Sequence, residues 1–385
     1  MKKLKITIAL FTVMMLLMAC GADSGKETPA ETPAEAPQEE PAEEPAESPA
    51  EGEAEENEQE PEAEEPAEDV KEYTVDMLYP FESDTHRVYE GKGNEYAAYD
   101  VYVDFMKEDR IQLRENNGGT EIVRVLEKKE GMLKEIIFEP ETYYKENFLS
   151  KEANTDRILL MEPVAEGTTW KSGEETSTIT AVEKEVETPY GTFDAVEVTR
   201  VTKTDNGEYT NIDYYAENLG LIKTLNIGEG YEVSSSLEKI EKDTAQRKVV
   251  NFYYPNAMDE RIFLYRKEIA FTTNDIPRML LIEAYKDLPK EAAPVLTPNT
   301  RVNYLYLNQD GMVYVDLSKE FLTEMNAGAG YESLILQSLA NTFGDYYGTS
   351  KVLLTIDGET YESGHILLRE FEPLEVNYDS IVDMN

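Results

Sequence analysis

Hydrophobic and polar positions divide the chain into regions with different periods. Ile6 to Met18 is an almost unbroken apolar run, whereas residues 21–70 contain no aromatic residue and a single valine. Further along, apolar and polar side chains alternate, which predicts strands, and beyond about residue 245 helical spacing joins this alternation. We therefore expect a signal peptide at 1–19, a stalk at 20–74, a β-domain at 75–244, an α+β domain at 245–375 and a tail at 376–385.

The region 75–244 predicts an antiparallel β-rich domain. Alternating runs such as Ala98–Phe105 and Ile122–Leu126 recur along it. Turn-forming segments such as Asn116–Gly119 and Pro189–Gly191 separate the runs. No stretch between the turns has a convincing helical period. We expect an antiparallel β-domain in the form of a curved sheet or an open barrel.

The region 245–375 predicts strands and helices in the order ββαββαβ, with two helices packed on one sheet. Helical spacing runs from Ile276 to Leu288, with Asn274 and Asp275 as candidate caps, and again from Tyr331 to Phe343. With the β-domain before it, the predicted fold class is α+β. The expected strands of this region are 249–254, 261–271, 301–307, 312–317, 351–356 and 359–361.

Cys20 is the only cysteine of the chain and ends the sequence Leu17-Met18-Ala19-Cys20. The apolar run before it follows three lysines, is too short to span a bilayer and is typical of a cleaved export signal. The ending resembles the lipobox of bacterial lipoproteins, in which the cysteine sulfur carries a diacylglycerol and becomes the first residue of the mature chain. The alternative is an ordinary secretory signal with an incidental cysteine, although an unpaired thiol outside the cell would be a liability.

This resemblance implies lipidation of Cys20, with palmitate-type acyl chains, and a location on the extracytoplasmic face of the cell membrane. The lipid bilayer is then the first expected partner. Two acyl chains on one residue are sufficient for this, because two chains anchor stably where one holds only marginally.

The chain is strongly acidic, with 79 Asp and Glu against 36 Lys and Arg and a net charge of −43. Residues 21–70 alone hold twenty acidic residues and one lysine. Without apolar side chains to offset the entropy of ordering, we expect this segment to be an acidic Pro/Glu/Ala-rich disordered stalk. The acidity repels nucleic acid, so we exclude nucleic-acid binding.

Residues 301–358 resemble the GerMN domain, a module of sporulation and spore germination. The front half, with residues 251–255 and 264–266, fits the same family, so the expected GerMN-like domain is 245–375. The resemblance is carried by the strand Gly311–Ser318, the helix Glu332–Phe343 and the closing segment Lys351–Gly358. One departure is Leu288-Pro289, where family members usually have Gly-Pro after the first helix. The resemblance implies an extracytoplasmic, membrane-tethered and non-catalytic protein that assembles with other proteins near the cell envelope.

The sequence offers little catalytic or metal chemistry. Its two histidines, His86 and His365, lie far apart in the chain, and we find no nucleophile elbow, phosphate loop or zinc motif. A calcium loop could be suspected at Asn308, Asp310 and Asp316, but their spacing lacks the bidentate Glu that such a loop needs. The segment from Asn308 instead predicts a hairpin turn. We therefore expect no enzyme activity, no cofactor and no metal site.

One constellation on the 301–317 hairpin stands out. Because side chains alternate along strands, Tyr304, Tyr306, Met312 and Tyr314 should share the face opposite the aliphatic residues. Tyrosine and methionine are enriched at interaction surfaces, so these four residues, the tyrosine ladder, are candidates for partner binding. The alternative is that neighbouring strands or the β-domain cover them.

The expected function is that of a non-catalytic binding or scaffold lipoprotein, in sporulation or spore germination, with an envelope protein as partner. The alternative is recognition of cell-wall glycans, peptidoglycan among them, by the exposed tyrosines. An enzyme of the envelope is the third hypothesis, weakened by the absence of a poised nucleophile, base or metal cluster from the sequence.

Overall fold

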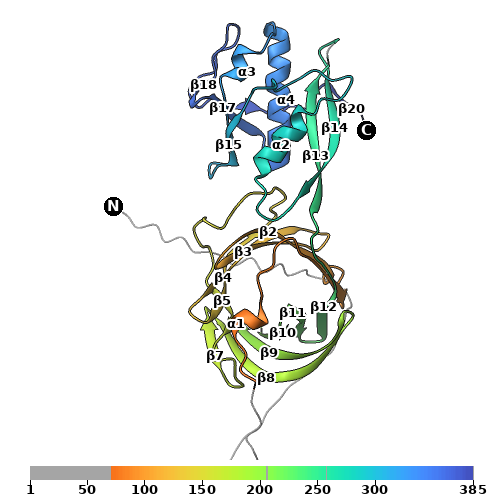
Figure 1. Ribbon diagram of the computed structural model, residues 1–385, viewed down its shortest axis with the longest axis vertical. Helices are drawn as coiled ribbons and strands as arrows, with labels where there is room; N and C mark the ends of the chain where they lie inside the picture. The colour runs from red at the N-terminus through yellow and green to blue at the C-terminus, as the bar shows by residue number, and fades with distance from the viewer. Residues whose placement is uncertain (1–70, 205–206, 257, 385) are drawn as a thin grey trace, which may run out of the picture. The chain divides into compact units, whose positions relative to one another are not determined.

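The computed structural model describes residues 71–204, 207–256 and 258–384 (Figure 1). Cys20, the expected signal peptide and nearly all of the expected stalk lie outside these residues. In the part of the chain that the structure describes, no helix has both the length and the apolarity needed to cross a membrane.

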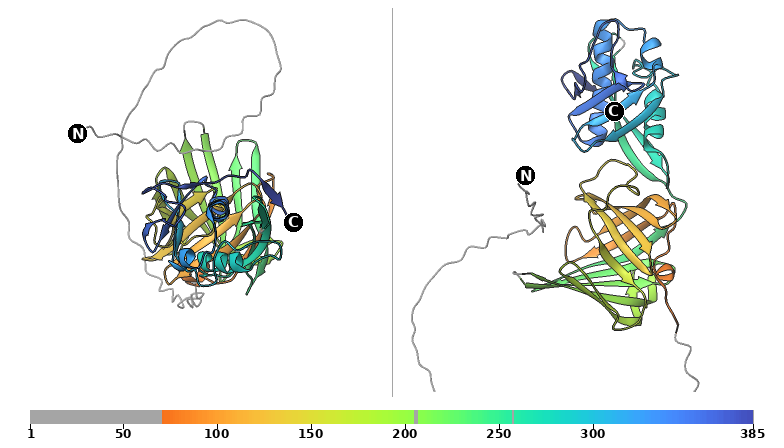
Figure 2. Two further views of the ribbon diagram at one scale, coloured as in Figure 1. Left: turned by 90° about the horizontal axis from the view of Figure 1, so that it is seen from above. Right: turned by 90° about the vertical axis from the view of Figure 1, so that its left-hand side faces the viewer.

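The first half of the described chain is one antiparallel sheet of twelve strands, in the order β6-β5-β4-β3-β2-β1-β12-β11-β10-β9-β8-β7. Figures 1 and 2 show how strongly it curves. The strands are β1 (His86–Lys92), β2 (Tyr99–Lys107), β3 (Arg110–Asn116), β4 (Glu121–Lys129), β5 (Met132–Pro140), β6 (Arg157–Met161), β7 (Thr169–Ser172), β8 (Glu175–Thr188), β9 (Gly191–Thr204), β10 (Gly207–Ala216), β11 (Gly220–Gly228) and β12 (Tyr231–Glu241).

The two edge strands of this sheet, β6 and β7, are joined by side chains. The Trp170 indole N–H donates to the Ile158 carbonyl at 3.0 Å, and the Ile158 N–H donates to Ser172 Oγ at 3.0 Å. The short helix α1 (Val75–Leu78) starts at Thr74, whose hydroxyl accepts from the Met77 N–H. It buries Val75 and Leu78 in the core that the inward-facing residues of the sheet form.

The C-terminal region, residues 246–384, contains two further sheets. The first pairs β13 (Gln246–Pro255), β14 (Ile262–Phe271) and β20 (Ile381–Asp383), and the second joins β15 (Val302–Leu307), β16 (Val313–Leu317), β17 (Lys351–Ile356), β18 (Glu359–Thr360) and β19 (Leu374–Glu375). The helices are α2 (Pro277–Lys286), α3 (Glu320–Thr323) and α4 (Ala329–Tyr347). Residues from both sheets and all three helices share one hydrophobic core.

The expectation of two helices on one sheet is therefore wrong. The strands divide between two sheets because β14 pairs in parallel with β20, which comes from the expected tail, rather than with β15. A third short helix, α3, also follows β16. The expected caps of α2 do not act as caps, since its N-cap position is Ile276 without a side-chain bond.

Among the strands of the first sheet, the sequence pattern missed β1, β11 and β12. Their inward positions carry polar residues such as Arg87, Asn226 and Ser235, because these positions line a cavity rather than a dry core. Polar residues on both faces of a strand remove the alternation on which a sequence-based prediction depends.

Candidate functional site

Three tyrosines of the ladder lie on one face of the β15–β16 hairpin. In its register Tyr306 stands opposite Tyr314, and Leu305, on the other face, stands opposite Val315. The Tyr306 ring lies 5.7 Å from the Tyr304 ring and 5.7 Å from the Tyr314 ring, centroid to centroid. The four ladder side chains are half-buried. This exposure fits neither a fully covered core nor a fully open surface, so partner binding by the ladder stays a prediction.

Hydrogen bonds fix the ladder in place. The Tyr304 hydroxyl lies 2.9 Å from Thr355 Oγ1 on β17, and the Tyr314 hydroxyl donates to Asp310 at 2.8 Å. Thr355 in turn donates to the buried carboxylate of Asp316 at 2.6 Å. The tyrosines are therefore held in one arrangement before any partner arrives, which lowers the entropic cost of binding.

The other sequence candidates show structural roles. Asn308 and Gly311 close the hairpin turn, and among the described residues no group of three or more His, Cys, Asp or Glu side chains could hold a metal ion. His86 lies between the carboxylates of Asp100 and Glu241, 2.9 Å from each. His365 is exposed.

A cavity of about 410 Å³ lies inside the curved twelve-stranded sheet. This size falls in the range of small-molecule sites. Part of the wall is apolar, and two tyrosine rings on it, Tyr89 and Tyr99, are stacked at 4.5 Å. The aliphatic lining residues include Val101, Val103, Ile111, Leu126, Leu159 and Leu221.

The charged side chains of the cavity neutralise one another. Arg124 lies between two carboxylates, and the other lining arginines each have a carboxylate within 4.0 Å. The pairs are Arg124 with Glu115 (3.0 Å) and Glu135 (2.5 Å), Arg87 with Glu82 (4.0 Å), Arg157 with Glu175 (2.7 Å), and Arg200 with Asp213 (2.5 Å). Burial alone lowers the pKa of Arg124, but its two carboxylates outweigh burial and raise that pKa above its ordinary value.

Six neutral polar side chains line the same cavity without a hydrogen bond to any other described residue. They are Tyr79, Tyr96, Tyr99, Asn211, Thr224 and Asn226. Burial raises the pKa of Tyr99 well above its ordinary value. Its hydroxyl, like any tyrosine hydroxyl at neutral pH, is protonated and can donate. The cavity therefore combines an apolar wall, internally paired charges and free hydrogen-bonding groups. The sequence pattern gave no sign of it, because its lining is contributed by strands spread over some 150 residues.

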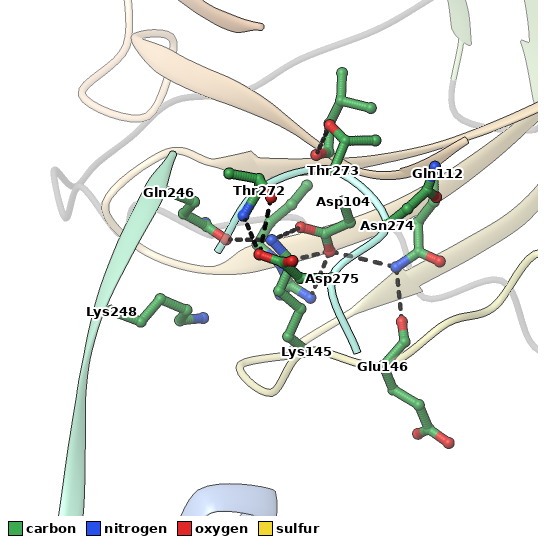
Figure 3. Close-up of polar contacts among 12 residues, drawn as sticks. Asp104, Gln112, Lys145, Glu146, Gln246, Lys248, Thr272, Thr273, Asn274 and Asp275 are labelled. Atoms are coloured by element: carbon green, nitrogen blue, oxygen red, sulfur yellow. Dashed lines mark hydrogen bonds and ion pairs between the residues drawn. The ribbon is translucent and has the colours of Figure 1, made fainter. Parts of the chain in front are cut away.

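A second ionic cluster joins the twelve-stranded sheet to the C-terminal region (Figure 3). Asp104 on β2 is fully buried and lies 2.9 Å from Arg114 on β3 and 3.0 Å from Lys145. Gln246 on β13 accepts a hydrogen bond from Lys145 at 3.4 Å, and Lys248 forms an ion pair with Glu121 at 2.7 Å.

The loop between β14 and α2 also docks on β2, as Figure 3 shows. The Asn274 side chain accepts from the Met106 N–H at 2.9 Å, and the Asn274 N–H donates to the Asp104 carbonyl. Thr273 Oγ1 donates to the Val103 carbonyl at 3.0 Å and accepts from the Asp84 N–H at 2.8 Å. Of the two residues expected to cap a helix, Asn274 therefore connects the two regions instead, whereas Asp275 accepts from Thr272 within the loop.

Comparison with known families matches one part of the chain. Residues 251–362 match the Germane family, described as sporulation and spore germination. These residues form a GerMN-like domain, which contains the tyrosine ladder. None of the curated proteins compared with the chain matches it.

Several solved structures are similar to parts of the chain. The first GerMN domain of the sporulation protein GerM from Bacillus subtilis is 20% identical, covers 33% of this chain and 97% of its own, and has a TM-score of 0.25. A candidate lipoprotein from Clostridium perfringens is 18% identical over 34% of this chain and 88% of its own, with a TM-score of 0.23. A second candidate lipoprotein, from Parabacteroides distasonis, is 14% identical over 43% of this chain and 98% of its own, with a TM-score of 0.27.

Proposed function

We propose that this chain is a lipoprotein held on the extracytoplasmic face of the cell membrane through Cys20, and that it acts there as a non-catalytic binding protein. The match of residues 251–362 to a sporulation and germination family is the observation that carries the functional part. The basic and apolar residues before Cys20 support the anchor.

The partner surface we propose is the tyrosine ladder. It belongs to the GerMN-like domain, and it lies at the edge of the second sheet because β15 pairs only with β16. Hydrogen bonds position the hydroxyls of Tyr304 and Tyr314. Rigid aromatic side chains of this kind supply contact area at low entropic cost. The expected partner is a protein of the cell envelope.

The anchor is tested by fractionating cells that produce the Cys20→Ser chain. We expect the wild-type protein in the membrane fraction, labelled by a palmitate analogue, and the variant released and unlabelled. An exported variant that stays membrane-bound would contradict the anchor.

The partner surface is tested by cross-linking in living cells, followed by identification of the linked proteins. We expect the double variant Tyr304→Ser/Tyr306→Ser to lose cross-linked partners while keeping its thermal unfolding midpoint. Tyr209→Ser is the matched control, since Tyr209 is 38% exposed but lies on β10 of the first sheet. Unchanged partners together with lost solubility would favour a structural role for the ladder.

Sedimentation with purified peptidoglycan separates protein binding from the glycan-binding alternative.

A further inference from the structure

We propose that the cavity inside the twelve-stranded sheet is a binding site for a short uncharged saccharide. This inference concerns a region outside the GerMN-like domain and does not depend on the proposed function. It rests on the size of the cavity, about 410 Å³, and on the balance of its lining groups.

The paired charges point to an uncharged ligand. Each arginine on the wall already has a carboxylate within 4.0 Å. A charged ligand would have to separate such a pair, and by filling the cavity it would displace the water that could otherwise solvate the member left without a partner, which is costly. A neutral ligand avoids this cost and can accept from the outer N–H groups of the same arginines.

The free polar groups point to a ligand with several hydroxyl or amide groups. The hydroxyls of Tyr79, Tyr99 and Thr224 and the amides of Asn211 and Asn226 have no partner among the described residues. A ligand that displaced water from them without replacing its hydrogen bonds would lose affinity. An acyl chain would displace water from every one of these groups without replacing its hydrogen bonds. The hydroxyls of a saccharide can replace them, because each can both donate and accept.

The apolar wall completes the match. Tyr99 is stacked on Tyr89, Val101 follows Tyr99 on β2, and Leu221 on β11 accepts a hydrogen bond from the Tyr89 hydroxyl through its carbonyl. A sugar ring has an apolar C–H face and a polar rim, so it can contact such a wall while its hydroxyls reach the amides. A ligand that was polar on all sides would bury less apolar surface against this wall, so its binding would gain less free energy from the hydrophobic effect.

The test uses the full chain with Cys20→Ser, so that no detergent competes for the cavity. Binding of maltose, diacetylchitobiose, the charged sugar sialyllactose and the monoacyl lipid monolaurin is measured by ligand-observed NMR and calorimetry. We expect one or both neutral disaccharides to bind and the other two probes not to bind. Absence of binding by both neutral disaccharides, or binding of monolaurin or sialyllactose alone, would overturn the proposal.

Three substitutions locate the site. Tyr99→Phe removes one hydroxyl and keeps the stacked ring, whereas Asn211→Ala and Asn226→Ala remove amides that make no bond to other described residues. Each should weaken disaccharide binding about fivefold to tenfold, the effect of one hydrogen bond. Thr210→Ala, on the outer face of β10 next to Asn211, is the matched control and should bind as the unmodified chain does. Equal binding by all four variants would place the sugar elsewhere and overturn the site.

Discussion

Arg114 and Arg124 lie on adjacent strands of the same sheet, each between two carboxylates, yet they have opposite surroundings. Arg124 is opposite Leu113 in the register, and Arg114 is opposite Val123, so the two arginines face opposite sides of the sheet. The Arg114 side chain is 0% exposed under the C-terminal region, whereas the Arg124 side chain is 25% exposed at the cavity. The same arrangement, one arginine between two carboxylates, therefore occurs at a buried junction and at the wall of a cavity.

The difference shows what each cluster can do. Around Arg114, the Asp104 and Glu121 carboxylates and the carbonyls of Thr142 and Tyr144 accept from the guanidinium. Every nitrogen of the buried guanidinium donates a hydrogen bond, and such a network rigidifies its surroundings. Around Arg124, Glu115 and Glu135 accept, and the cavity beside them can admit water or a ligand. We infer that the first cluster joins two regions and the second shapes a binding site.

The largest expected effect comes from Arg114→Met. It leaves Asp104 with Lys145 and the Gln112 amide, and Glu121 with Lys248, around an unfilled position in a buried site, so the free energy of unfolding should fall by about 3–5 kcal/mol. Arg124→Met is the matched variant and should cost about 1–2 kcal/mol, because water in the cavity can solvate the carboxylates left behind. Urea unfolding of both variants measures the difference. Equal losses would show that the two clusters are energetically alike.

The pH dependence of the junction is the next effect. Burial alone would raise the pKa of Asp104, but Arg114 and Lys145 outweigh it and hold the pKa below its ordinary value. A carboxyl with a lowered pKa in the folded state contributes stability above its unfolded pKa, about 3.9, and loses it as the pH falls through the folded value.

Unfolding measured between pH 7 and pH 2 should therefore show a steep loss of stability below about pH 4. Asp104→Asn should be less stable than wild type at pH 7 and should lose less on acidification. Parallel pH profiles for the two chains would mean that Asp104 does not drive the acid transition. Asp100→Asn serves as the control, since Asp100 is a half-buried carboxyl on the same strand, β2.

A smaller effect is expected from Thr273→Val in the docking loop. This change keeps the shape of the side chain but removes the acceptor for the Asp84 N–H and the donor to the Val103 carbonyl. We expect a loss of about 1–2 kcal/mol in the free energy of unfolding. Amide hydrogen exchange should accelerate at Asp84 in the variant. Unchanged exchange there would show that the loop does not hold the two regions together.

The sequence allowed the hairpin and its aromatic face to be predicted better than either ionic cluster. Tyr304, Tyr306 and Tyr314 alternate with aliphatic residues, so local periodicity places them on one face. Arg114 and Arg124 stand in similar local sequence, each within an alternating strand. Which of them becomes buried depends on the loop after β5 and on the C-terminal region, which cover one side of the sheet, and no local pattern records this.

The smallest effect is expected from a matched pair of isosteric changes, Glu115→Gln at the cavity and Glu121→Gln at the junction. The two carboxyl side chains are similarly exposed, 19% and 16%. Glu121 pairs with Arg114 and Lys248, however, whereas Glu115 pairs with Arg124, which keeps Glu135. Glu121→Gln should therefore cost about 1–2 kcal/mol and Glu115→Gln less than about 1 kcal/mol in the free energy of unfolding. A larger loss at Glu115 would mean that the cavity cluster, rather than the junction, stabilises the fold.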